Sequence, residues 1–175
     1  MNADELRQTQ APLKSRYRDD PAAARHTLHA VGRIDPQRQT CTIEAAYAPE
    51  VAAGLHPAAG GDGSAACPAG MLLQALAACS GVTLATVATA LGVSVKGGTV
   101  TAEGDLDFRG TLGVSKDVPV GFNEIRLRFD LETNADDNQL ANLLRLTERY
   151  CVVFQTIKAT PRLTSTMFRQ GDAPA

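Results

Sequence analysis

An apolar segment sets the first limit on the fold of this chain. The segment MLLQALAACSGVTLATVATALGV, from Met71 to Val93, contains no charged residue. Pro68 stands just before it, where a first-turn proline starts a helix, and Gly92 ends the pattern. The sequence therefore predicts a helix over 68–91, roughly 35 Å long at 1.5 Å per residue. Because this helix is apolar around its whole circumference, it must be covered on all sides.

A membrane span is one alternative for this helix, because about 20 apolar residues are enough to cross a bilayer. However, Gln, Ser and Thr residues interrupt the segment, and its many alanines contribute little transfer free energy. No cluster of Lys or Arg flanks either end. A buried core helix is the better interpretation, and we expect no membrane partner.

A second copy of the chain is the natural cover for this helix. One domain of 175 residues can hardly bury it alone. Its small residues, among them Ala75, Ala78 and Gly81, allow another helix to approach closely. The sequence therefore predicts a homodimer.

The other segments predict an α+β fold with antiparallel sheets, because alternating apolar patterns flank the long helix and a second helical segment follows. The domain is expected over 24–170, after an N-terminal arm over 1–23 and before a C-terminal tail over 171–175. The predicted elements are a β-hairpin over 24–34 and 40–47, a long loop over 48–70 with one helical turn at 50–53, strands over 99–108 and 124–132, a helix over 134–150 capped by Asn134 or Asp136, and a last strand over 162–168.

Composition limits the possible partners and the compartment. The net charge is −2, from 17 basic and 19 acidic side chains, and aromatic residues make up 5% with no Trp. A nucleic-acid partner is therefore not expected, because such proteins show a basic face and stacking aromatics. The N-terminus has no apolar stretch of a secretory signal, so we expect a cytoplasmic protein whose four cysteines are not structural disulfides.

The thiol of Cys79, inside the apolar helix, has four interpretations: a small apolar filler, half of a disulfide, a metal ligand or a nucleophile. Cys151 follows 72 residues later, between a helical segment and a new apolar one. If a second helix starts there, its free N–H groups favour a thiolate. Cys41, on the expected inward strand face with Ala45 and Tyr47, is interpreted as core, and Cys67 precedes the long helix in an exposed loop.

Metal and cofactor sites are not expected. His26 and His29 are three residues apart, so on a strand they point to opposite faces, and His56 stands alone in the Gly-rich loop. The sequence contains no Cys-x-x-Cys, and its GGDG segment lacks a phosphate-binding consensus.

Two segments, CPAGMLLQALAACSGVTL and ERYCVVFQTI, together with this order of elements, resemble the OsmC/Ohr family. The resemblance covers roughly 24–168, and the two cysteine segments are its most specific parts. It implies an OsmC-like α+β fold in which antiparallel sheets wrap around the long helix. It also implies an intertwined homodimer in which the two long helices pack against each other.

The resemblance further implies a cytoplasmic, thiol-dependent peroxidase that reduces organic hydroperoxides in oxidative or osmotic stress. In the family the first cysteine, which corresponds to Cys79, is the peroxidatic thiolate, and the second, which corresponds to Cys151, is the resolving cysteine. Attack of Cys79 on the peroxide releases an alcohol and leaves a sulfenic acid. Cys151 then condenses with it to a disulfide, and an external thiol or dithiol reduces the pair.

One position departs from the Ohr branch of the family. In that branch a glutamate follows the proline that opens the helix and helps to hold an activating arginine over the thiolate, whereas this chain has Ala69. Arg33 and Arg38 are candidates for the arginine, and Arg149 is expected to point away from Cys151.

Two other functions remain open from the sequence. In one, the same dimer binds a small apolar ligand beside the long helix, and the thiols only pack. In the other, the protein is a redox sensor whose Cys79–Cys151 disulfide changes its contacts with a partner.

Overall fold

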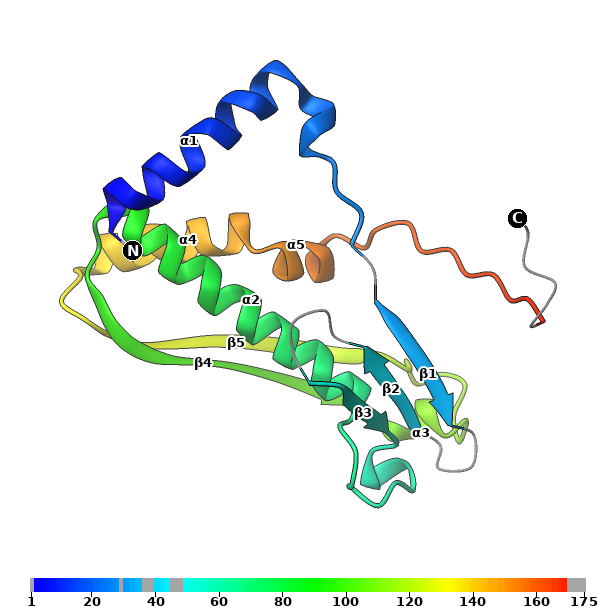
Figure 1. Cartoon of the computed structure of the whole chain (residues 1–175). Coiled ribbons are helices and arrows are strands. Elements are labelled where there is room, and N and C mark those ends of the chain that lie inside the picture. Colours follow the sequence, from blue (N-terminus) through cyan, green and yellow to red (C-terminus); the bar gives the residue numbers. More distant parts are fainter. Residues whose placement is uncertain (1, 29, 36–39, 45–48, 170–175) are drawn as a thin grey trace.

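The computed structural model describes residues 2–28, 30–35, 40–44 and 49–169. They form an α+β fold with two antiparallel sheets and one long helix, as predicted (Figure 1). One sheet has three strands in the order β1-β2-β3, and the other is the two-stranded ribbon β4-β5.

The long helix α2 spans Pro68–Leu91, as predicted from its two ends. Pro68 occupies the first turn, and Gly92 ends the helix with a left-handed φ of 69°, which glycine adopts without a steric penalty. Within the described residues α2 alone is long and apolar enough for a membrane span, although core helices of soluble proteins share that composition. Its packing against β4, α4 and α5 agrees with a core helix.

The ribbon of β4 (Val95–Leu106) and β5 (Phe122–Thr133) lies under α2. Burial alternates along both strands, so the predicted inward residues of β5 lie on the half-buried side; these are Ile125, Leu127, Phe129 and Leu131. On the outer face Arg126 pairs with Glu103, Asp105 and Glu124.

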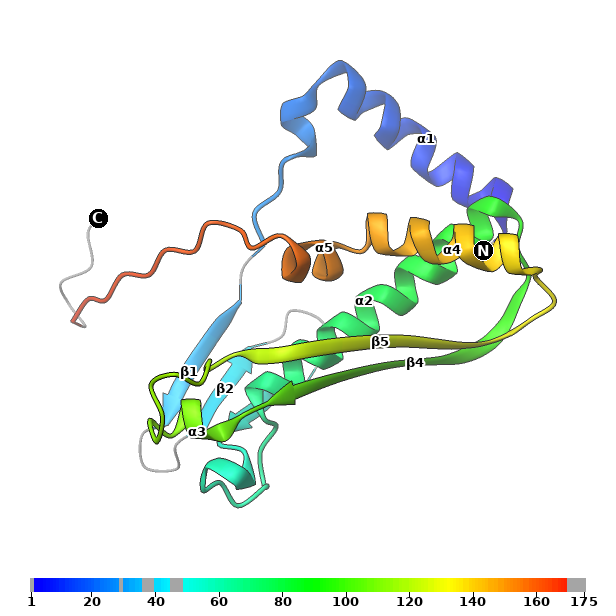
Figure 2. The same cartoon turned by 180° about the vertical axis from the view of Figure 1, so that it is seen from behind.

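Two helices follow the ribbon, and both contact α2, which runs obliquely to them (Figures 1 and 2). Helix α4 spans Asp137–Tyr150 and is capped by Asp136, one of the two predicted caps. Helix α5 spans Val152–Lys158, and Cys151 separates the two. A core cluster forms where α2, α4 and the ribbon meet; its buried members are Leu84, Val87, Ala88 and Leu143.

The predicted hairpin is formed by β1 (Val31–Asp35) and β2 (Thr40–Glu44), which pair antiparallel. The predicted helical turn over 50–53 is wrong, because Val51–Gly54 forms β3 and pairs with β2. Small side chains allow this pairing, and Ala53 is additionally bridged to Ala66. The helical turn lies instead at Pro57–Ala59 (η2).

The N-terminal arm is mostly helical. Helix α1 spans Ala3–Asp19, and a short 3-10 turn, η1, follows at Pro21–Ala24. Asn2 and Glu5 cap α1 reciprocally, although the sequence predicts only an arm here and no helix. Helix α1 contacts α2 but has no fully buried residue, so it stands beside the main body of the fold (Figures 1 and 2).

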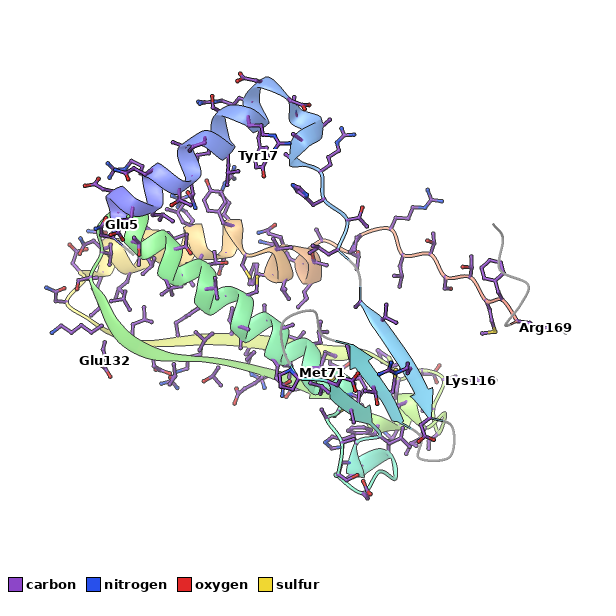
Figure 3. All side chains as sticks on the ribbon, viewed as in Figure 1. Glu5, Tyr17, Met71, Lys116, Glu132 and Arg169 are labelled. Carbon is purple, nitrogen blue, oxygen red and sulfur yellow. The ribbon has the colours of Figure 1, made fainter. Side chains whose placement is uncertain are left out.

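Two expectations about strands are wrong. Phe108 lies not in a strand but in the short helix α3 (Phe108–Thr111), where its ring stacks on His56 at 4.9 Å between centroids. Residues 160–169 form no strand in the described structure, because a strand needs a hydrogen-bonded neighbour and this segment leaves the body of the fold. Figure 3 shows it extending away toward Arg169, with Leu163 92% and Met167 96% exposed.

Candidate dithiol site

The structure brings two of the four cysteines together. Cys79 lies on α2 and is half-buried, whereas Cys151 is fully buried at the junction of α4 and α5. Ser80, which directly follows Cys79 on α2, lies with its Oγ 3.3 Å from the Cys151 Sγ, and the Cys79 thiol is among the groups that lower the pKa of Cys151. Neighbouring thiols in separate elements are the arrangement needed for a reversible disulfide.

The backbone around Cys151 explains its position. Its N–H donates to the carbonyl of Thr147 at 2.9 Å, which closes α4, and its extended backbone then starts α5. The Cys151 Sγ accepts a hydrogen bond from the N–H of Phe154 at 3.4 Å, as an N-cap side chain does. The expected second helix at Cys151 is therefore confirmed.

Ser80 is a site residue that sequence reasoning missed. Its Oγ lies 3.3 Å from the Cys151 Sγ, and both side chains are 0% exposed. The contact joins residues 71 positions apart, so only the packing of α2 on α4 and α5 reveals it. Its one sequence signal was its place directly after Cys79 in an uncharged segment.

The surroundings of Cys151 lower the pKa of its thiol. Burial raises this pKa, but the hydrogen bonds from the Ser80 hydroxyl, the Phe154 N–H and the Cys79 thiol outweigh burial. Donors of this kind stabilise the thiolate more than the thiol. The surroundings of Cys151 therefore favour its thiolate form.

A second buried hydroxyl lies one turn before Cys151. Thr147 is 1% exposed, and its Oγ1 has no hydrogen-bond partner among the described residues. A buried hydroxyl without a hydrogen-bond partner costs free energy.

An apolar cleft of about 250 Å³ lies between α2, β5, α4 and α5, lined by neighbours of the two cysteines although not by the cysteines themselves. Leu76, one turn before Cys79, forms one wall, and Phe154 forms another. Glu148 and Lys158 also line the cleft, and its remaining lining residues are Ile125, Leu127, Phe129, Leu144 and Ile157.

The other cysteines and the histidines lie apart from this site. Cys41 on β2 is half-buried. Cys67 is the N-cap residue of α2, and it is half-buried rather than exposed. His26 precedes β1 rather than lying in a strand, and His29 lies outside the described residues, as do Ala45 and Tyr47. The described residues contain no group of three His, Cys, Asp or Glu side chains able to hold a metal ion.

The structure places two of the three arginines considered from the sequence, Arg33 and Arg149. Arg33 on β1 forms an ion pair with Glu50 at 2.6 Å. Arg149 is exposed and lies over the Tyr150 ring at 5.7 Å, which agrees with the expectation that it points away. Arg38 lies outside the described residues.

Together, the α+β fold and the neighbouring thiols of Cys79 and Cys151 define a candidate dithiol site beside a long central helix. The family profile described as "OsmC-like protein" matches residues 61–166. The chain belongs to this family, as the two cysteine segments indicated.

Solved structures share the fold at low identity. An OsmC-like protein from Mycoplasma pneumoniae is 15% identical, with a TM-score of 0.65 over 77% of this chain and 89% of that chain. The organic hydroperoxide resistance protein OsmC from Legionella pneumophila is 16% identical, with a TM-score of 0.57 over 77% and 93%. An organic hydroperoxide resistance protein from Elizabethkingia anophelis is 15% identical, with a TM-score of 0.61 over 78% and 91%. A search of curated proteins gave no match.

Proposed function

We propose that this protein is a cytoplasmic, thiol-dependent peroxidase that reduces organic hydroperoxides. Cys79 is the nucleophile, Cys151 is the resolving cysteine, and a thiol or dithiol is the reductant. Membership of the OsmC-like family and the names of the Legionella and Elizabethkingia proteins support this activity.

The observation that carries the proposal is the proximity of Cys79 and Cys151: Ser80, next to Cys79 in the chain, lies 3.3 Å from the Cys151 sulfur, and the Cys79 thiol lowers the pKa of Cys151. Cys79 is half-buried and accessible to a substrate, whereas Cys151 is fully buried behind it. A peroxide therefore meets Cys79 first, and the resulting sulfenic acid has a second thiol beside it. Cys151 displaces water from the sulfenic acid and forms a disulfide.

The cleft lined by Leu76 and Phe154 supports an apolar substrate. Its apolar walls suit the alkyl or aromatic part of a hydroperoxide. The charged side chains of Glu148 and Lys158 line the same cleft, where they can contact the polar part of a substrate.

We also propose the intertwined homodimer. Exposed residues of α2 form an uncharged stripe at helical spacing, consisting of Leu72, Ala75, Ala78, Val82 and Ala85. A stripe of this kind is typical of an interface between copies rather than of a surface in water. The exposed Leu163 and Met167 of the C-terminal segment point to the same need for a partner.

The test is a Cys79→Ser substitution, with cumene hydroperoxide as the substrate and a dithiol as the reductant. We expect loss of turnover and, in the wild type, rapid loss of two thiols with a Cys79–Cys151 link in a disulfide map. Cys41→Ser and Cys67→Ser are matched controls that should keep activity, because neither thiol lies at the site. Unchanged turnover in Cys79→Ser would contradict the proposal.

Ligand binding is the second candidate function, and the apolar clefts favour it. A second cleft of about 290 Å³ adjoins the first, and both share Leu127, Phe129 and Leu144. An apolar ligand retained through purification, with both thiols unreactive to hydroperoxide, would support this function instead.

A further inference from the structure

Ser80 makes the two sulfur atoms of the dithiol unequal. Its hydroxyl and the N–H of Phe154 both reach the sulfur of Cys151, at 3.3 and 3.4 Å. Cys151 and Ser80 are each 0% exposed, whereas Cys79 is half-buried. The Cys151 sulfur is therefore held by donors in a closed site, whereas Cys79 is only partly buried.

We propose that Ser80 is a positioning residue that sets the direction in which the disulfide is reduced. The incoming thiol attacks the sulfur of Cys79, and the sulfur of Cys151 is the leaving group. This inference rests on the proposed thiol-peroxidase cycle and specifies its reductive half.

Two steps complete the reduction. A thiolate RS⁻ attacks the Cys79 sulfur, an RS–S bond forms, and the Cys79–Cys151 bond breaks with its electron pair on Cys151. A second RS⁻ then attacks the R sulfur of the mixed disulfide and releases RSSR and the Cys79 thiolate. Two thiols are oxidised to one disulfide, the protein disulfide is reduced to two thiols, and solvent supplies or takes the protons.

Access decides which sulfur is attacked. The Cys151 sulfur has no exposed surface, so a thiolate would have to open the contact between α2, α4 and α5 to reach it. Cys79, by contrast, is only half-buried, so its sulfur is the one that a thiolate reaches without opening this contact.

The hydrogen bonds decide which sulfur leaves. A thiolate leaves faster when its charge is stabilised, and Cys151 has two donors in place where that charge develops. Once Cys151 is a thiolate, it can no longer donate a hydrogen bond to Ser80. The Ser80 hydroxyl is therefore the donor of this pair in the product state. The site therefore stabilises one leaving group and not its neighbour.

The first experiment reads the position of attack. A Cys41→Ser, Cys67→Ser variant is oxidised with diamide, treated briefly with glutathione, quenched with a maleimide and mapped by mass spectrometry. We expect glutathione on Cys79 and maleimide on Cys151. Glutathione on Cys151, or failure of the Cys79–Cys151 disulfide to form, would overturn the proposal.

The second experiment removes the hydroxyl. In Ser80→Ala we expect slower reduction by glutathione, about threefold for each unit by which the pKa of Cys151 rises, given a Brønsted coefficient of about 0.5. Ser80→Thr should restore the rate, since it keeps the hydroxyl. Thr86→Ala is the matched control, because its hydroxyl on the same helix bonds only the carbonyl of Val82.

A structural role alone would not change the acidity of one thiol. Ultraviolet titration of the thiolate should show a higher pKa of Cys151 in the Cys79→Ser, Ser80→Ala double variant than in the Cys79→Ser single variant. An unchanged rate together with an unchanged pKa would overturn the role of Ser80.

The diamide step keeps this test independent of the peroxidase activity. If hydroperoxide does not react but glutathione still adds to Cys79, the proposed function fails and the direction of reduction stands. If hydroperoxide turnover is normal but glutathione adds to Cys151, the function stands and this inference fails.

Discussion

At the scale of single residues, hydrogen bonds rather than charge set the chemistry of the site. The groups that lower the pKa of Cys151 are a hydroxyl, two backbone N–H groups and a second thiol, and none of them is a cation. The glutamate of the Ohr branch is absent, since the first turn of α2 contains Ala69 and no acidic residue. The site therefore uses neutral donors to stabilise its buried sulfur.

This environment predicts a pH-dependent stability. Because the pKa of Cys151 is lower in the folded chain than in the unfolded chain, the thiolate stabilises the fold above the unfolded pKa of about 8.5, and this contribution is lost as pH falls through the folded pKa. We expect the reduced wild type to exceed Ser80→Ala in free energy of unfolding by roughly 1 kcal/mol at high pH and by less at low pH. Urea unfolding across pH measures this difference.

Thr86→Ala serves again as the control, because its hydroxyl bonds a backbone carbonyl that does not titrate. A difference between wild type and Ser80→Ala that stays constant with pH would show that Ser80 only packs.

At the scale of elements, the β4-β5 ribbon depends on a glycine. Gly98 has a φ of 152°, and a methyl group on it would overlap the carbonyl oxygen of Asp130 on the paired strand. Its neighbour Gly97 has ordinary space, because a methyl group there would meet only the Glu132 carboxylate at 3.7 Å or more. Position 98 therefore requires glycine, whereas position 97 has space for a methyl group.

We predict that Gly98→Ala lowers the free energy of unfolding by roughly 2 kcal/mol or more, because the backbone must shift to remove the overlap. Gly97→Ala is expected to change it by less than about 1 kcal/mol. Urea denaturation of the two variants measures the difference, and equal losses would contradict the structural reason.

At the scale of the whole molecule, much apolar surface remains uncovered in one chain. Val82 on α2 is 70% exposed, and Leu163 and Met167 in the C-terminal segment are exposed more fully still. Figure 3 shows the C-terminal segment leaving the body, while Lys116 and Glu132 mark opposite ends of the ribbon region. The proposed second copy would cover this surface.

We predict that Val82→Lys weakens the dimer, because a buried lysine without a partner is costly. Analytical ultracentrifugation should show a higher share of monomer in this variant than in the wild type. Thr101→Lys, on the exposed outer face of β4, is the control and should leave the association unchanged. A wild type that sediments as a monomer would contradict the proposed dimer.

Local signals in the sequence were enough to predict several elements. Pro68 and Gly92 fixed both ends of α2, because each acts through its own backbone geometry. Alternation predicted the inward face of β5, and Asp136 was one of two predicted caps of α4.

Other features depend on contacts between distant parts of the chain, and only the tertiary structure decided them. Strand β3 forms where a turn was predicted, because pairing with β2 overrides the weak preference of its small residues. The last predicted strand lacks such a neighbour in the described chain and stays unpaired. Ser80 and Cys151 meet across 71 residues because α2 packs on α4 and α5. The sequence determined which thiols the chain carries, and packing decided that one of them is held by a buried hydroxyl.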